Sequence, residues 1–278
     1  MKNWLKDKYV ILSGASGGIG RQLCKVLIEK YQAKVIGIGR NEEKMLSLKA
    51  ELGGKADNFT YQLFDVQNQT SWQRLKTWLV QQQIQPTLLI NNAGAFPTFA
   101  RTLDTPVEVT QRIMQTNYYS VVYAIEALQP LLIGTKKDRA GIVNVSSCAA
   151  LCTVVGTGAY SASKSALKSY TEALMIEEKG KMYVGLICPG TTATELFDGD
   201  ENTKNSALTK IAMPAEKMAK KIAKKIVKRK KRVVLGMDAK LMTFCSKIMP
   251  VKGLFLVRGV MKASKSKVFK NIFNENNK

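Results

Sequence analysis

Short apolar segments alternate along the chain with longer amphipathic ones. Seven of the apolar segments have a length typical of buried strands and are rich in Val, Ile and Leu. They cover residues 8–13, 34–40, 59–66, 87–94, 141–147, 181–190 and 232–236. Most of the intervening segments repeat their apolar residues at helical spacing. Apolar strands that alternate with helices predict a parallel sheet covered by helices on both faces.

Three of the amphipathic segments have the length of long helices. They predict one long helix over 106–132, a second over 157–178 and a third over 214–231. Asn117 lies inside the first of these among apolar neighbours, where it would either satisfy a backbone carbonyl or belong to a functional network. Residues 196–209 are rich in Asn, Asp and Gly, which is typical of a mobile loop beside a cleft.

The amino-acid composition excludes several kinds of catalytic and metal site. The chain has no histidine, which excludes a Ser-His-Asp triad, a Cys-His dyad and a histidine metal site, and we expect no metal. Its five cysteines form no C-x-x-C pair and are expected to be buried free thiols. We find no signal peptide and no apolar stretch of the ~18 residues that a membrane span needs. We therefore expect a cytoplasmic protein.

The formal charge of +22 is concentrated at the end of the chain. Residues 1–202 carry 22 basic and 18 acidic side chains, whereas residues 203–278 carry 21 basic and 3 acidic ones. Beyond residue 236 the basic residues alternate with apolar ones at helical spacing. This tail could pack on a partner subunit, cover a substrate cleft, or lie on a membrane surface. Nucleic acid is disfavoured because the tail lacks interleaved aromatic residues on a strand-like pattern.

A glycine cluster follows the first predicted strand and opens the first predicted helix. Gly14, Gly18 and Gly20 would let the backbone turn tightly, approach a pyrophosphate and pack the helix on the strand. The same spacing could serve only a tight turn. The second predicted strand ends at Gly39-Arg40, where a carboxylate would favour NAD and a guanidinium favours NADP. Arg40 could also simply cap the strand.

Tyr160 and Lys164 lie four residues apart on a predicted helix, so both can point into one cleft. A free tyrosine has a pKa near ~10, and a nearby ammonium would stabilise its phenolate. This pair alone is more typical of a solvated helix face. Ser147, at the end of the fifth predicted strand, and the upstream glycine turn instead favour a proton-transfer site.

This order of motifs resembles the short-chain dehydrogenase/reductase family over about residues 5–236. The residues that carry the resemblance are Gly14, Gly18, Ile19, Gly20, Asp65, Asn91, Asn92, Ala93, Gly94, Asn117, Ser147, Tyr160, Lys164, Pro189, Gly190 and Thr194. It implies one doubly wound, seven-stranded parallel sheet of Rossmann type at 1–236, followed by a helical extension at 237–278. It also implies a homodimer or homotetramer assembled through the helices around 105–130 and 157–178.

The resemblance assigns roles to the candidate catalytic residues. Tyr160 would donate a proton to a substrate carbonyl oxygen, and Ser147 would hydrogen-bond that oxygen. Lys164 would lower the pKa of Tyr160 and bind ribose hydroxyls, while Asn117 would position a water. The residues implied to hold the cofactor are Gly14, Ser16, Gly18, Ile19, Gly20, Arg40, Asp65, Val66, Asn92, Ala93, Gly94, Tyr160, Lys164, Pro189, Gly190, Thr192 and Thr194. Gly17 stands where NADP enzymes of the family often carry a basic residue, so the preference for NADP(H) over NAD(H) depends on Arg40.

The first functional hypothesis is hydride transfer between NADP(H) and a lipophilic ketone, aldehyde or secondary alcohol, of acyl or steroid-like type. The residues expected around the substrate are Phe96, Leu151, Val154, Val155, Leu196 and Phe197. The alternative is an NADP-binding scaffold or regulatory protein whose basic tail associates with a membrane surface or a polyanion. The intact set of Asn117, Ser147, Tyr160 and Lys164 argues against that alternative.

Overall fold

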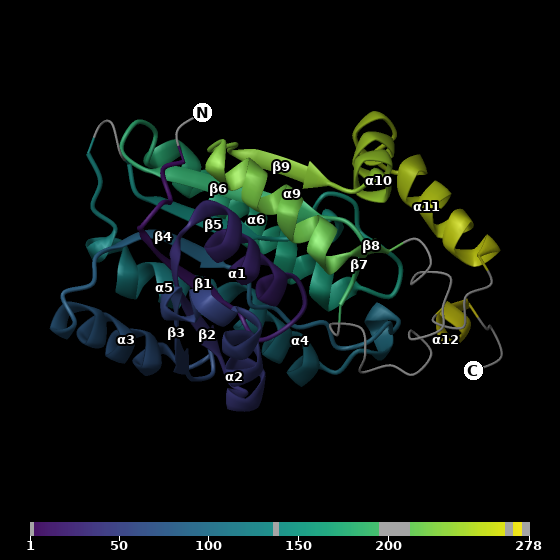
Figure 1. The fold of residues 1–278 in the computed structure, drawn as a ribbon. Coiled ribbons are helices and arrows are strands. Elements are labelled where there is room, and N and C mark those ends of the chain that lie inside the picture. Colours follow the sequence, from purple (N-terminus) through teal and green to yellow (C-terminus); the bar gives the residue numbers. More distant parts are fainter. Residues whose placement is uncertain (1–2, 136–138, 195–211, 265–268, 274–278) are drawn as a thin grey trace.

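A seven-stranded sheet forms the centre of the molecule. The computed structural model describes residues 3–135, 139–194, 212–264 and 269–273. All neighbouring strands are parallel, in the order β3-β2-β1-β4-β5-β6-β9 (Figure 1). The strands are β1 (Tyr9–Ser13), β2 (Lys34–Gly39), β3 (Phe59–Leu63), β4 (Pro86–Asn91), β5 (Gly141–Val145), β6 (Tyr183–Pro189) and β9 (Arg232–Leu235). The predicted Rossmann sheet is confirmed, and its topological switch point lies between β1 and β4.

Helices bury both faces of this sheet. On one face α1 and α9 pack side by side, with α2 at its edge; α3, α5 and α6 cover the other (Figure 1). Their bounds are α1 (Gly18–Tyr31), α2 (Glu42–Glu51), α3 (Gln69–Gln81), α5 (Ser120–Leu128), α6 (Gly158–Glu177) and α9 (Ala215–Val227). Helix α9 shows why they pack in this way, since Met218, Ile222 and Ile226 are buried on one side while lysines occupy the other.

The long helix predicted over 106–132 is helical from residue 107 to residue 131, but it is not a regular α-helix throughout. The segment consists of α4 (Val107–Met114), a π-helical turn (Gln115–Tyr119), α5 and a short 3₁₀ turn (Gln129–Leu131). A π turn carries one extra residue, and such turns often occur at functional sites. Here it surrounds Asn117, whose side chain is completely buried.

The predicted helix over 214–231 is also shorter than expected. Pro214 belongs to β8 (Met213–Pro214), which pairs with β7 (Thr192–Ala193), and α9 ends at Val227. Arg229 has a φ of 48°, which is incompatible with a continuing helix. The predicted loop at 196–209 lies outside the described residues.

The C-terminal extension is helical, as predicted. It contains α10 (Met237–Ile248), α11 (Lys252–Ala263) and α12 (Lys270–Phe273), beyond the carboxyl end of β9 (Figure 1). In the described part of the chain, no helix is both long and apolar enough to cross a membrane. Four cysteines are buried and all five are free thiols, in agreement with the sequence.

Candidate active site

The turn between β1 and α1 leaves an open helix N-terminus. Gly14 has a φ of 70°, and a Cβ at Gly20 would collide with the Gly14 carbonyl oxygen. Ile19 packs against the core beside this turn. The N-cap Gly17 supplies no side-chain hydrogen bond, and the first turn of α1 contains no acidic residue. The backbone N–H groups of a helix N-terminus without a side-chain cap favour a phosphate.

The carboxyl ends of β1 and β4 are tied together at the switch point. The Ser13 hydroxyl oxygen accepts the backbone N–H groups of Asn92, at 3.0 Å, and Ala93, at 3.1 Å. The Asn92 side-chain amide donates in return to the Ser13 carbonyl oxygen at 3.1 Å. Ser13 was not predicted as a site residue, and its position directly before Gly14 was the only signal for it.

Arg40 and Asp65 meet at the ends of β2 and β3. Their side chains form an ion pair of 3.3 Å and are 74% and 40% exposed, so solvent screens the pair. A Cβ at Gly39 would lie 3.0 Å from the Ser16 hydroxyl oxygen, which places the glycine turn beside this pair. Val66 is buried, and its carbonyl oxygen accepts the indole N–H of Trp72.

Ser147, Tyr160 and Lys164 come together between β5 and the first turns of α6. The Ser147 hydroxyl lies close enough to the Tyr160 phenol to favour its ionised form. Lys164 is 4% exposed; its ammonium donates to the Val145 carbonyl oxygen at 3.2 Å and lies 6.0 Å from the centre of the Tyr160 ring. Burial lowers the pKa of Lys164 to about 8.

The pKa of Tyr160 differs from the expectation. Burial raises it to about 12, although the Ser147 hydroxyl acts in the opposite direction. Lys164 therefore does not lower the pKa of Tyr160 below its ordinary value in this structure, because desolvation of the phenolate outweighs the favourable contacts. At neutral pH the phenol keeps its proton and can act as a proton donor.

Asn117 links the loop after β4 to α6. Its Oδ1 accepts the backbone N–H of Ala95 at 2.8 Å, and its Nδ2 donates to the Ala95 carbonyl oxygen and the Ser163 hydroxyl oxygen, both at 3.0 Å. The Ser163 hydroxyl donates to the Tyr160 carbonyl oxygen at 2.7 Å. Ser163 was missed from the sequence. The amide of Asn117 thus positions the helix that carries Tyr160.

The segment after β6 faces the glycine turn and is held by the C-terminal extension. A Cβ at Gly18 would lie 3.2 Å from the Thr194 side chain. The Thr192 hydroxyl donates to the carbonyl oxygen of Gly190, the residue that directly follows Pro189. The backbone N–H of Thr191 donates to the Asp238 carboxylate at 2.7 Å. Asp238, in the first turn of α10, is a further residue that the sequence did not reveal.

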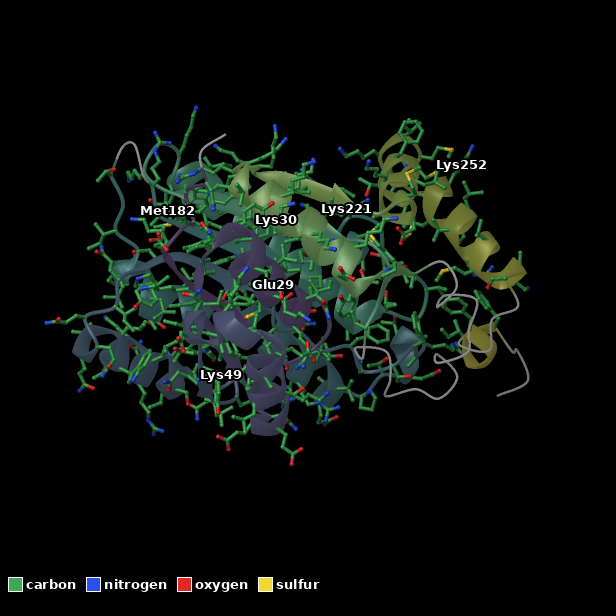
Figure 2. All side chains as sticks on the ribbon, in the orientation of Figure 1. Glu29, Lys30, Lys49, Met182, Lys221 and Lys252 are labelled. Atoms are coloured by element: carbon green, nitrogen blue, oxygen red, sulfur yellow. The ribbon has the colours of Figure 1, made fainter. Side chains whose placement is uncertain are left out.

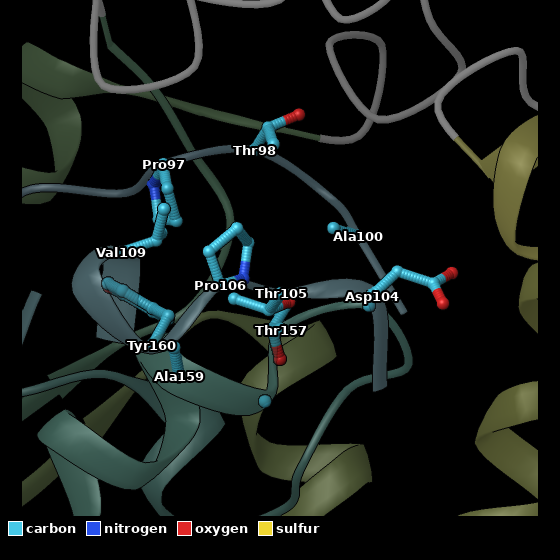
Figure 3. Close-up of a pocket in the computed structure, with 12 residues that line it drawn as sticks. Pro97, Thr98, Ala100, Asp104, Thr105, Pro106, Val109, Thr157, Ala159 and Tyr160 are labelled. Carbon is cyan, nitrogen blue, oxygen red and sulfur yellow. The ribbon is translucent and has the colours of Figure 1, made fainter. Parts of the chain in front are cut away.

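Tyr160 lines a cavity of about 220 Å³ (Figure 3). Its walls come from the loop after β4, the start of α4 and the start of α6. The lining residues are Pro97, Thr98, Ala100, Asp104, Thr105, Pro106, Val109, Gly156, Thr157, Gly158, Ala159 and Tyr160. The lining is mainly apolar, with the Asp104 carboxylate at the end opposite Tyr160.

A chain of aromatic rings runs from Tyr160 to the C-terminal extension. Tyr160 packs edge-on against Phe96, with ring centres 5.2 Å apart. Phe96 packs in the same way against Phe99, at 4.8 Å, and Phe99 packs against Phe269, at 5.2 Å. Phe269 directly precedes α12 and is only 2% exposed. The end of the tail therefore lies at the cleft, in agreement with one of the three interpretations of the sequence.

A second cavity of about 460 Å³ opens beside α11 and α12. It shares Gly156 and Gly158 with the cavity at Tyr160. The residues that line it are Arg101, Thr102, Thr153, Val154, Val155, Gly156, Gly158, Leu254, Phe255, Arg258, Ile272 and Phe273. Of the side chains expected around the substrate, Val154 and Val155 line this second cavity, and Phe96 packs against Tyr160. The Leu151 carbonyl oxygen accepts the Ser246 hydroxyl of α10, and Leu196 and Phe197 lie outside the described residues.

Comparison with known proteins assigns the family. The family model described as short chain dehydrogenase matches residues 8–205, so the chain belongs to that family. It is 31% identical over 201 residues to the mouse dehydrogenase/reductase SDR family member 7B, covering 70% of this chain and 61% of that protein. The chain thus spans less than two thirds of that relative.

Two further proteins are similar in sequence or structure. The NADPH-dependent pterin aldehyde reductase of Arabidopsis thaliana is 28% identical over 188 residues, covering 68% of this chain and 76% of that protein. The closed form of serine dehydrogenase complexed with NADP+ superimposes with a TM-score of 0.71 at 25% identity, covering 82% of this chain and 94% of that one.

Proposed function

We propose that the protein is an oxidoreductase that transfers hydride between NADP(H) and a lipophilic ketone, aldehyde or secondary alcohol. One observation carries this proposal: Tyr160 lines a largely apolar cavity and has Ser147 and the Lys164 ammonium as neighbours. Membership of the short chain dehydrogenase family supports the same class of reaction. A binding scaffold would have no need for a buried ammonium beside a buried phenol, since burying a charged group is costly.

The residues around the switch point fit a dinucleotide. The N-terminus of α1 has no side-chain cap, and a Cβ at Gly94 would lie 3.2 Å from both the Lys164 ammonium and Asn117 Oδ1, so Gly94 permits a close approach. Bound there, the nicotinamide would supply the hydride. The pyrophosphate would lie on the turn from Gly14 to Gly20, and the remaining predicted cofactor residues would line the adenosine and nicotinamide ends.

Arg40 supports NADP(H) rather than NAD(H). Its side chain is 74% exposed and follows Gly39, which adjoins Ser16 of the glycine turn, so the guanidinium can pair with a 2′-phosphate. The similar plant reductase is NADPH-dependent, and the similar serine dehydrogenase is complexed with NADP+. Binding of a phosphate would compete with Asp65 for the same guanidinium.

For reduction, Tyr160 is the proton donor. Its raised pKa keeps the phenol protonated at neutral pH, and the substrate carbonyl oxygen would accept this proton as negative charge develops on it. The Ser147 hydroxyl would hydrogen-bond the same oxygen. The Lys164 ammonium would bind ribose hydroxyls and stabilise the phenolate that remains. Asn117 would keep α6 in position, either directly or with a bound water.

The apolar cavities favour an acyl or steroid-like substrate. Phe96, Val154 and Val155 would contact it, and the exposed Asp104 pairs with Arg101 at 3.6 Å rather than facing Tyr160. Assembly as a homodimer or homotetramer remains a proposal derived from the family.

Nicotinamide absorbance with a panel of ketones, aldehydes and acyl carbonyls tests this function. We expect reduction with NADPH, and an NADPH affinity at least ~10-fold higher than that for NADH. Arg40→Asp should reverse that preference, because a carboxylate accepts the free 2′-hydroxyl and repels a phosphate. Lys49→Asp, which makes the same change of charge on an exposed face of α2, is the control. Failure of both nucleotides to bind would refute the proposal.

A further inference from the structure

Helices α10 and α11 expose an unusual amount of apolar surface. Met237, Leu241, Phe244 and Ile248 follow one face of α10 and are 61 to 79% exposed. The exposed apolar residues after α10 and on α11 are Met249, Val251, Leu254, Phe255, Leu256 and Val260. We call these ten residues the apolar face. So many exposed apolar side chains on two neighbouring helices indicate an interaction site.

The two helices form a unit attached to the catalytic part of the chain. Gly253 packs so closely on α10 that a Cβ there would lie 2.7 Å from the Cys245 carbonyl oxygen. The Ser246 hydroxyl donates to the Leu151 carbonyl oxygen, and Asp238 holds the backbone of Thr191. The apolar face is therefore held in a defined orientation beside the site.

Basic side chains surround the apolar face. Lys240, Lys247, Lys252, Arg258 and Lys262 are all exposed on α10 and α11. The only acidic residue among residues 237–264 is Asp238, whose carboxylate already accepts the Thr191 N–H. Apolar side chains among cations are typical of a helix that lies in the interface of an anionic bilayer. A second copy of this chain fits less well, because its own cations would face these.

The apolar face continues into the cavity that leads to Tyr160. Leu254 and Phe255 belong to the face and also line the 460 Å³ cavity. Gly156 and Gly158 are shared between that cavity and the one at Tyr160. A lipophilic molecule that leaves a bilayer beneath α11 would enter the cavity that adjoins the site at these two glycines.

We infer that the apolar face docks on an anionic lipid bilayer surface, from which a lipophilic carbonyl substrate enters the cavity beside α11. The docking follows from the exposed side chains and charges alone, whereas the substrate path rests on the proposed function. The two parts can therefore be tested separately.

Sedimentation of the full chain with lipid vesicles tests the docking. We expect binding to vesicles of phosphatidylcholine with phosphatidylserine to be at least ~10-fold tighter than to phosphatidylcholine alone, and to weaken with salt. Leu241→Asp/Phe244→Asp should reduce binding at least ~10-fold, because charges would enter the apolar layer. The matched control is Leu46→Asp/Val80→Asp, which changes two exposed apolar residues on α2 and α3.

Reversal of charge provides a second, independent variant. Lys247→Glu/Lys252→Glu should also lose binding, while Lys49→Glu/Lys179→Glu should not. Figure 2 shows Lys252 and Lys49 on well-separated parts of the molecule. Equal binding to both kinds of vesicle, or no effect of either variant on α10 and α11, would overturn the inference. The inference would also be overturned if the wild-type chain does not bind vesicles but forms a dimer that Leu241→Asp/Phe244→Asp dissociates.

Turnover separates this inference from the proposed function. With a water-soluble aldehyde, Leu241→Asp/Phe244→Asp should match the wild type; with a long-chain ketone delivered in anionic vesicles, it should be at least ~10-fold slower. Equal rates for the ketone would refute entry from the bilayer. Vesicle binding without turnover of any carbonyl would refute the proposed function and leave the docking established.

Discussion

Replacing Lys164 with Met should change how the stability of the protein depends on pH. Burial lowers the pKa of Lys164 from its ordinary 10.5 to about 8 in the folded state. Between these values the unfolded chain retains a proton that the folded chain has lost, so the stability of the wild type rises with pH. The Met variant lacks this contribution.

The magnitude follows from the two pKa values. Below pH ~8 the buried ammonium costs the folded state about 3 kcal/mol, since each unit of pKa corresponds to about 1.4 kcal/mol. Between about pH 7 and pH 9.5, roughly 2 kcal/mol of that cost should disappear. The free energy of unfolding of the wild type, minus that of Lys164→Met, should rise by this amount.

Urea unfolding at a series of pH values measures the difference. The buried cysteines, including Cys148, have raised pKa values and destabilise the fold as pH rises above their ordinary 9.0, but both proteins contain them. Tyr160, whose pKa is also raised, destabilises the fold only above its ordinary 10.0, so the series ends below that pH. Lys49→Met, on an exposed face of α2, should give a flat difference. A flat or falling difference for Lys164→Met would refute the desolvation of this ammonium.

Two further substitutions probe the positioning of the site. Asn117→Ala should destabilise the fold by about 2–3 kcal/mol in urea unfolding, because it removes the partner of the half-buried Ala95 backbone groups and of the buried Ser163 hydroxyl. Asn68→Ala, which removes only the N-cap of α3, should cost about 1 kcal/mol, and an equal loss for both would contradict the account. Gly156→Ala should raise KM for lipophilic carbonyls with unchanged NADPH affinity, since its Cβ would collide with the Ile272 side chain in α12. Gly180→Ala is the control, because Gly180 also has a positive φ but a Cβ there would meet no atom within 4 Å. An unchanged KM for Gly156→Ala, or a raised KM for both variants, would contradict the role of α12.

The sequence predicted the sheet well because each strand is a local signal. All seven apolar segments became strands, and even the four residues of β9 were predicted. The π turn at Asn117 was missed because one extra residue in a helical turn barely alters apolar spacing. Its function depends on partners at Ala95 and Ser163, which are distant in sequence.

The parts of the site that were missed depend on long-range contacts. Ser13 and Asp238 are ordinary residues in the sequence, and only the fold brings them to Asn92 and Thr191. The place of the tail was one of three open interpretations, because the packing of Phe269 on Phe99 joins residues that no periodicity connects. The pKa of Tyr160 depends on how deeply α6 is buried, which spacing alone does not reveal.

The most direct test of the central claim compares Tyr160→Phe with the wild type in the NADPH-linked reduction of a carbonyl. The substitution removes only the hydroxyl that donates the proton and keeps the ring that packs against Phe96. We predict that turnover falls at least ~100-fold while NADPH affinity stays within a few-fold of the wild type. Turnover that persists in Tyr160→Phe would contradict the assignment of this phenol as the proton donor.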